Sequence, residues 1–297
     1  MTRLFGFMVA VLLAAAPGRA EVPAVVTDIA PVQSLVAMVM QGLGTPEMIV
    51  TPGGGAHGVA LRPSQARALQ GADLVIWMGP ELTPRLSKPI KTLAGRAVQL
   101  QLLDAPNTHL LSLREDDGHN HDSDGHHDPH AWLDPENGHL WLGLIAELLA
   151  AQDPENAPRY RANALAGQAG LVVLQSELTA LLKPMKRRAY VTFHDAYQYF
   201  ENRFGLSPVG AVSASDAGNP GPARVARLQE RLAKAGKYCA FSAPQFDPGM
   251  LQAVTGRDDL SIIPLDPMGA QLTVGPGLYP ALLRDMAQAF AGCASGE

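Results

Sequence analysis

The chain has 297 residues, a formal net charge of −5 with histidine neutral, and only two cysteines. This acidic balance argues against a nucleic-acid partner and suits a cationic ligand. The length allows two modest domains or one large one, so a sizeable hydrophobic core is expected.

The first 20 residues have the pattern of a secretory signal peptide. Arg3 precedes an apolar run over residues 4–16, and small residues lead up to Ala20. The run is too short for a stable transmembrane helix. We therefore expect export to the periplasm with cleavage after Ala20, and residues 1–20 take no part in the predicted fold.

Residues 21–152 are predicted to form a first α/β lobe. Apolar runs that read as strands alternate with helix candidates that begin at Pro31, Arg62 and about Pro84. The strands are expected at residues 24–27, 48–51, 73–78 and 97–103. Such alternation predicts a parallel sheet covered by helices on both faces.

A long helix is predicted to link this lobe to a second one. After a helix at residues 135–151, the segment 153–183 opens with an Asp-Pro cap and meets no strong breaker before Pro184. A helix of this length extends over on the order of 43 Å, which is more than one small domain needs. We therefore interpret the segment as a rigid connector.

Residues 184–297 are predicted to form a second lobe with the same four alternations. Its strands are expected at residues 189–193, 209–212, 238–241 and 261–265. Its helices are expected at residues 195–204, 222–235, 248–255 and 279–291. The predicted fold class is therefore α/β, with two four-stranded parallel sheets flanked by helices, one long connecting helix and a cleft between the lobes.

Four potential metal ligands follow predicted strands, where parallel sheets place their ligands. His57 stands on a glycine-rich loop after the second strand, and His130 lies beyond the fourth. His194 and Asp266 directly follow strands of the second lobe. A set built mainly of imidazole favours zinc over manganese or magnesium. We therefore predict a Zn²⁺ site in the cleft, formed by two residues from each lobe.

Each of these residues also has an ordinary structural interpretation when taken alone. His57 could be a surface residue of a glycine loop, His194 a hydrogen-bonded structural residue, and Asp266 the cap of a turn. His109 and His139 are interpreted as structural.

A histidine-rich, acidic segment covers residues 116–128. It contains two glycines and shows no periodicity, so we expect a solvated loop. Beyond Asp128, the apolar Trp132 and Leu133 should fix His130 against the folded body. The other histidines are predicted to form weaker secondary zinc sites, the alternative being a tolerated insertion without a role; they are His119, His121, His126 and His127.

The two cysteines, Cys239 and Cys293, both fall in the second lobe. In an exported protein they could form a disulfide, the alternative being two buried thiols.

Six segments together resemble one known family. They are GAHGVALRPS (55–64), DLVIWMGPEL (73–82), DPHAWLDP (128–135), FHDAYQYF (193–200), PQF (244–246) and LDPMG (265–269). With them the chain resembles the ZnuA-type solute-binding proteins of ABC importers, within the metal-binding cluster that also holds manganese members. The resemblance spans most of the chain after residue 20 and is specific as a set.

The resemblance implies a monomeric periplasmic protein that captures Zn²⁺ and delivers it to an inner-membrane ABC permease. It implies that His57, His130 and His194 are the metal ligands. Manganese members usually carry glutamate where His194 stands, so this histidine favours zinc. Acidic, histidine-rich insertions before the second ligand and paired cysteines in the second lobe also fit zinc members.

Two positions depart from the family pattern. Some zinc members have glutamate immediately before the first histidine as a fourth ligand, and here that residue is Ala56. Many relatives have an acidic residue before Pro-Gln-Phe, and here it is Ala243. The fourth coordination position is therefore left to water or Asp266.

Three other functions compete with zinc delivery. Three histidines and a water also make a catalytic zinc site, so a zinc-dependent hydrolase is one alternative, although the sequence has no His-Glu-x-x-His pairing that would supply a general base. A manganese-binding relative is the second. A periplasmic metal buffer or adhesin that uses the same fold without a permease is the third.

Overall fold

The structure is a computed structural model that describes residues 22–51, 53–54, 60–114, 127–213, 221–257 and 260–295. The proposed signal segment lies outside these residues. So do His57 and three of the loop histidines, namely His119, His121 and His126.

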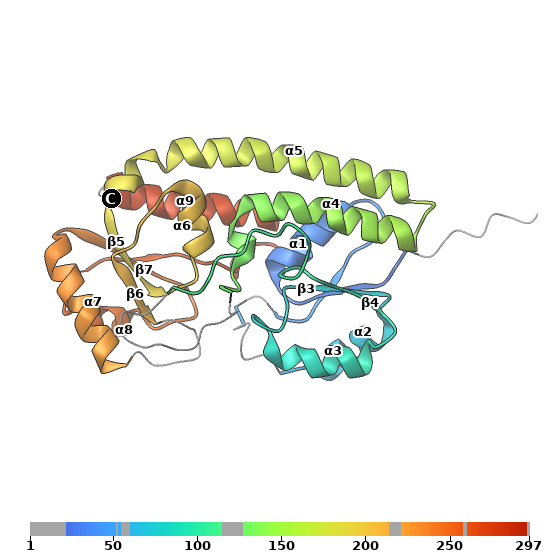
Figure 1. Cartoon of the computed structure of the whole chain (residues 1–297), viewed down its shortest axis with the longest axis horizontal. Helices are drawn as coiled ribbons and strands as arrows, with labels where there is room; N and C mark the ends of the chain where they lie inside the picture. Colours follow the sequence, from blue (N-terminus) through green and yellow to red (C-terminus); the bar gives the residue numbers. More distant parts are fainter. Residues whose placement is uncertain are drawn as a thin grey trace, which may run out of the picture.

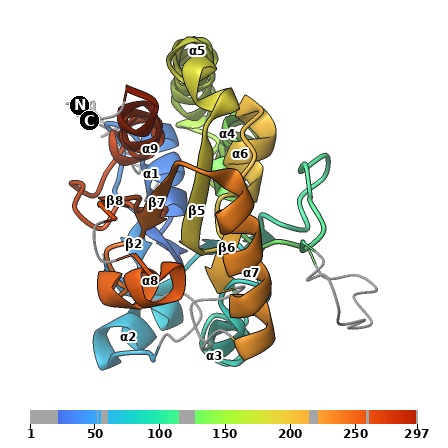
Figure 2. The same ribbon diagram turned by 90° about the vertical axis from the view of Figure 1, so that its left-hand side faces the viewer.

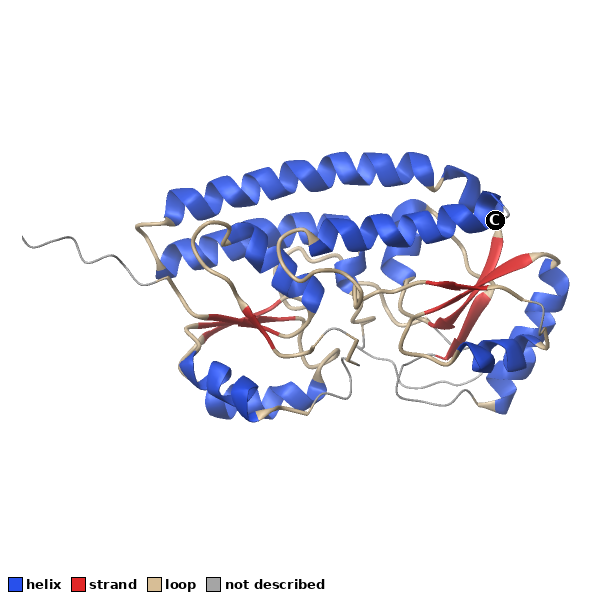
Figure 3. Ribbon diagram, turned by 180° about the vertical axis from the view of Figure 1, so that it is seen from behind, coloured by secondary structure: helices blue, strands red, loops and turns tan. Residues whose placement is uncertain are grey.

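In the first lobe, the described residues form a sheet of four parallel strands in the order β2-β1-β3-β4. The strands are β1 Val25–Thr27, β2 Glu47–Met48, β3 Leu74–Trp77 and β4 Val98–Gln101. The helices are α1 Ala30–Val39, α2 Pro63–Gly71 and α3 Ser87–Leu93, the last preceded by the 3₁₀ turn Pro84–Leu86. Helices lie on both sides of this sheet (Figure 3).

The apolar runs of this sheet alternate between two cores. Leu74 and Ile76 of β3 belong to the large core under α1, whereas Val75 and Trp77 belong to a smaller core with Leu69 of α2. Successive side chains of a strand point to opposite faces. A strand covered on both faces therefore needs a continuous apolar run, and such runs allowed these strands to be predicted from the sequence.

The second lobe repeats the topology of the first. Its described strands are all parallel and have the order β6-β5-β7-β8, the counterpart of the order in the first lobe. They are β5 Ala189–His194, β6 Gly210–Ser213, β7 Tyr238–Ser242 and β8 Ile262–Pro264. The helices are α6 Gln198–Phe204, α7 Pro222–Ala235, α8 Pro248–Thr255 and α9 Leu278–Ser295. The predicted fold class is confirmed.

One long helix, α5, connects the lobes, and α4 precedes it. α4 covers Pro135–Gln152, and α5 covers Ala157–Leu181 and extends along both lobes beside α9 (Figure 1). At 25 residues, α5 is about 37 Å long. It begins later than predicted because Asp153 ends α4 and accepts hydrogen bonds from Asn156 and from the Tyr160 hydroxyl, at 2.7 and 2.9 Å.

The outer face of α5 is unusually apolar. Among the described helices, α5 alone is long and apolar enough by composition to cross a membrane. Leu165, Val172 and Val173 are more than half exposed, whereas Leu171 and Leu178 are buried in the large core. The inner face therefore makes α5 part of the folded body.

Several predicted boundaries were wrong by a few residues. β2 ends at Met48, although Ile49 and Val50 still donate backbone hydrogen bonds to Thr27 and Asp28 and are buried. Helix α6 begins at Gln198 rather than at residue 195. Burial therefore continues past the ends of regular structure, and apolar runs overestimate strand length.

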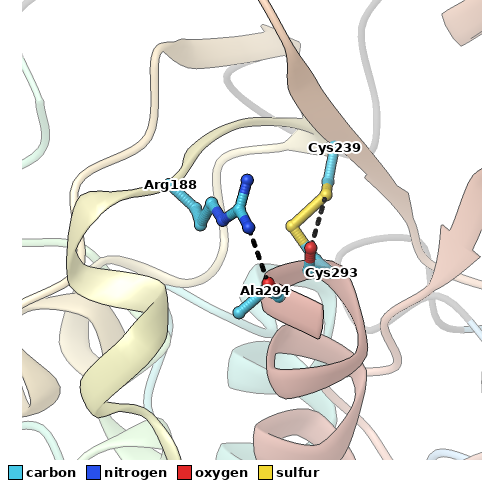
Figure 4. Close-up of a disulfide and its surroundings, with 4 residues drawn as sticks. All are labelled: Arg188, Cys239, Cys293 and Ala294. Carbon is cyan, nitrogen blue, oxygen red and sulfur yellow. Dashed lines mark hydrogen bonds between the residues drawn. A yellow bond between two sulfur atoms is a disulfide. The ribbon is translucent and has the colours of Figure 1, made fainter. Parts of the chain in front are cut away.

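The predicted disulfide is confirmed. Cys239 on β7 and Cys293 on α9 are joined at an S–S distance of 2.03 Å with their Cα atoms 6.0 Å apart (Figure 4). Nearby, the Arg188 side chain donates a hydrogen bond to the Ala294 carbonyl at 2.9 Å. The end of the last helix is thus held to the sheet of the second lobe by both a covalent and a polar contact.

Replacing both cysteines with alanine should lower the free energy of unfolding by about 2 to 4 kcal/mol, because the cross-link restricts the unfolded chain. Urea unfolding of the parent and the variant measures the difference. A reductant should shift the parent toward the variant and leave the variant unchanged. Equal stability of the two proteins would contradict the prediction.

Candidate metal centre

Two buried histidines from distant parts of the chain meet at their ring nitrogens. The Nε2 atoms of His130 and His194 lie 3.3 Å apart, and the residues are 7% and 4% exposed. Two nitrogens bound to one tetrahedral zinc at roughly 2.0–2.1 Å are themselves about 3.3 Å apart. The pair therefore has the spacing of two corners of a zinc tetrahedron.

Asp128 orients the ring of His130. Its Oδ1 accepts a hydrogen bond from the His130 ring Nδ1 at 2.7 Å and from the His130 backbone N–H at 2.9 Å. With its proton on Nδ1, the ring directs the lone pair of Nε2 toward His194. A carboxylate that holds a ligand histidine in this way fixes its tautomer and makes it a stronger base toward metal.

The segment that carries His130 is short and tightly anchored. Ala131–Leu133 form a 3₁₀ turn whose residues are all buried. Asp134 then caps α4 by accepting a hydrogen bond from the Glu136 N–H at 3.0 Å, with Pro135 in the first turn. The Trp132 indole N–H donates to the carbonyl of Pro267 at 2.8 Å. The Asp-Pro-His-Ala-Trp-Leu-Asp-Pro sequence therefore fixes both ends of a single turn.

Side chains of α6 hold the same segment from the second lobe. The Tyr199 hydroxyl donates to the carbonyl of Asp128 at 2.8 Å and accepts from the Leu111 N–H at 3.0 Å. Arg203 makes two hydrogen bonds to the carboxylate of Asp134, at 2.7 and 2.8 Å. The His130 segment thus precedes α4 and α5 in the sequence, but it contacts the second lobe.

A charged network lies beside His194. Arg114 donates to Asp195 at 2.9 Å and also to Glu201, which in turn accepts from the Tyr190 hydroxyl at 2.8 Å. Burial raises the pKa of Glu201 to about 7 despite the opposing effect of the Arg114 guanidinium. Burial likewise raises the pKa of Asp195, again opposed by Arg114.

The described residues give Asp266 a different set of contacts. Its carboxylate accepts backbone hydrogen bonds from Met268, Gly269 and Ala270, at 2.8, 3.1 and 2.5 Å. Gly269 has a φ of +71°, which suits a tight turn. Over the described part of the chain, no group of three or more His, Cys, Asp or Glu side chains could hold a metal ion. These contacts favour the turn cap, and the ligand role of Asp266 stays a prediction.

The histidine-rich segment has a described stem. Ser112 and His127 form an isolated antiparallel bridge, and the Asp128 N–H donates to the carbonyl of Leu111 at 2.8 Å. The Gln198 amide of α6 donates to the carbonyl of Ser112 at 3.2 Å. His127 itself is exposed. The stem therefore leaves the body beside α6 (Figure 2).

The His109 ring and the His139 backbone both make contacts within the fold. The His109 ring lies 3.0 Å from Asp134, and the His139 carbonyl accepts from Gln168 at 2.9 Å. His57 and the remaining loop histidines lie outside the described residues. Their predicted roles stay predictions.

Sequence reasoning missed the residues that position the histidines. Asp128 and Asp134 flank His130 within its motif, and a search for carboxylates next to ligand histidines would have found them. The pairing of Arg203 with Asp134 and of Arg114 with Glu201 joins residues 69 and 87 positions apart. A single sequence contains no signal for such pairs.

Comparisons with known proteins show the family of the chain. Residues 25–293 match the family model described as zinc-uptake complex component A, periplasmic. The chain is 43% identical to the high-affinity zinc uptake system protein ZnuA of Paracoccus denitrificans, over 96% of this chain and 95% of that protein.

Two solved structures share the fold. The periplasmic zinc-binding protein TroA from Treponema pallidum has a TM-score of 0.78 at 21% identity, covering 92% of this chain and 99% of that one. A Mn-bound periplasmic metal-binding protein from Candidatus Liberibacter asiaticus has a TM-score of 0.77 at 20% identity, with the same coverage.

Stability of the metal-free protein should depend on pH through Glu201. Its pKa is raised from 4.5 to about 7, so the stability that its protonated form contributes is complete below pH 4.5 and is lost as the pH rises through 7. Urea unfolding between pH 5 and 8 should show a smaller decline in Glu201→Gln than in the parent.

Glu177→Gln is the matched control, because Glu177 is half-exposed in its pair with Arg284 and the change should leave the pH slope as in the parent. Identical slopes for Glu201→Gln and the parent would refute the assignment.

Proposed function

Since the chain belongs to the ZnuA family of periplasmic zinc-uptake components, we propose that it captures Zn²⁺ in the periplasm and delivers it to an ABC-type importer in the inner membrane. The observation that carries this proposal is the pair of buried imidazoles with Nε2 atoms 3.3 Å apart, one of them held by a carboxylate. The ion is cargo, so its site must bind tightly and also release.

The proposed ligands are His57, His130 and His194. The described pair supplies two of them, and His57 is proposed from its motif. For the fourth position, the three backbone hydrogen bonds that Asp266 accepts favour water over this carboxylate. Three neutral imidazoles and water leave the full charge of Zn²⁺ on the complex, and the net acidity of the chain partly offsets it.

Zinc is favoured over manganese by the chemistry of the ligands. Imidazole suits zinc, whereas manganese prefers carboxylate, carbonyl and water oxygens. The Mn-bound neighbour shares the fold at 20% identity, so the fold alone does not select the metal. We attribute the proposed selectivity for zinc over manganese to the histidine at position 194.

Transport is favoured over hydrolysis by the kind of contacts at the site. A catalytic zinc site needs a general base beside its water. Asp128 already accepts hydrogen bonds from the ring and the backbone of His130. Asp195 and Glu201 beside His194 both accept from Arg114. These carboxylates therefore serve side chains of the protein rather than a substrate. We further propose that the protein acts as a monomer and that residues 1–20 direct its export and are removed after Ala20.

Single changes of His57, His130 or His194 to alanine should each weaken zinc binding by more than roughly 100-fold, because losing a ligand costs more than losing its hydrogen-bonding partner. Competition with a chromophoric chelator measures the affinity, and a parallel titration with manganese tests selectivity. His139→Ala is the control and should bind zinc as the parent does. Unchanged affinity in His194→Ala would remove this residue from the site.

The histidine-rich segment should bind zinc more weakly than the His57, His130 and His194 site, because its sequence offers few apolar residues to fix its ligands and ordering them costs chain entropy. Replacing residues 116–126 with a glycine–serine sequence of equal length should remove the weak sites and leave the tight one. Calorimetric titration separates the two classes. Loss of tight binding in this variant would mean that the segment contributes to the principal site.

A further inference from the structure

Helix α6 is a docking platform for the segment that carries His130. Its residues Gln198, Tyr199, Glu201 and Arg203 all bind positions between Leu111 and Asp134. The same helix begins four residues after His194, the last residue of β5. The two histidines are therefore attached to one short stretch of the second lobe.

The contact between Arg203 and Asp134 has the strongest geometry of this set. Two parallel N–H···O hydrogen bonds join a guanidinium to a carboxylate whose side chain is 1% exposed. Charge-assisted bidentate pairs of this kind are about twice as strong as neutral hydrogen bonds and also fix orientation. Asp134 additionally caps α4, so its position defines where the His130 turn ends.

The turn between His130 and Asp134 leaves little freedom for the ring. The Leu133 N–H donates to the carbonyl of His130 at 3.1 Å, and Trp132 is buried. The hydroxyl of Tyr279 on α9 donates to the carbonyl of Trp132 at 2.7 Å. A displacement of Asp134 would therefore move the His130 ring rather than be absorbed by the chain.

We propose that Arg203 is a positioning residue for metal capture, which keeps His130 opposite His194 so that the two imidazoles form a half-site within one rigid body. Zinc binds first to these two imidazoles, and the remaining ligands then coordinate the bound ion. This inference rests on the proposed function and specifies how its site is assembled.

The test uses His57→Ala protein, in which zinc binding reports on the two-histidine half-site. In this background, Arg203→Met should weaken zinc binding a further tenfold or so, the lower end of the effect expected for a partner behind the ligands. Arg203→Lys keeps the positive charge but cannot make the two parallel hydrogen bonds to Asp134. Its zinc affinity should therefore lie between those of Arg203→Met and the His57→Ala background. Chelator competition with zinc alone gives each value.

Two controls separate positioning from general stability. Arg284→Met breaks an exposed bidentate pair with Glu177 and should leave zinc affinity unchanged. Leu232→Ala removes a buried side chain of α7, so it should lower the melting temperature without changing zinc affinity. If Arg203→Met is too unstable to purify, Arg203→Lys carries the test.

The outcomes are distinct. Affinity of Arg203→Met within twofold of the His57→Ala background would overturn the positioning role while the proposed function stands; where Arg203→Met cannot be purified, the same result for Arg203→Lys would overturn it. A parent protein without tight zinc binding would overturn the proposed function and this inference together. A zinc affinity that falls in Leu232→Ala as much as in Arg203→Met would assign the effect to stability and also overturn the inference.

Discussion

Two imidazoles that are buried with their ring nitrogens facing each other impose the main constraint on this molecule. A buried polar group is costly unless it is hydrogen-bonded, and an unpaired charge costs more. The chain meets this constraint at His130 with Asp128, whose carboxylate accepts from both the ring and the backbone. Asp134, four residues after His130, is a second buried carboxylate of this segment, and it accepts hydrogen bonds from Arg203 and from the first turn of α4.

The symmetry of the two sheets hides an asymmetry in how the site is built. Each lobe has the same strand order, and the sequence predicts two ligands from each lobe, His57 and His130 from the first and His194 and Asp266 from the second. The contacts of α6 instead attach the His130 turn to the second lobe, through Tyr199 and Arg203. The His130 turn therefore belongs to the first lobe by its place in the sequence but to the second lobe by its contacts.

Much of the fold could be predicted because buried parallel strands need apolar runs on both faces, as β3 shows with Leu74, Val75, Ile76 and Trp77. The motifs around His130 and His194 marked both residues as candidates, and the structure brings their rings together, while their role as metal ligands stays a prediction. The start of α5 was predicted less accurately, because Asp153 ends the preceding helix α4 instead of beginning α5. The pairs Arg114–Glu201 and Arg203–Asp134 could not be predicted, because they depend on how distant segments pack.

The bridge between Ser112 and His127 has a practical consequence for protein engineering. It fixes both ends of the histidine-rich segment at one point on the surface, and Gln198 and Tyr199 hold that point to α6. Sequence inserted between these ends leaves the path of the chain through the His130 turn unaltered. A fluorescent domain grafted between Ser112 and His127 would therefore be attached beside α6, three residues before His130 in the sequence.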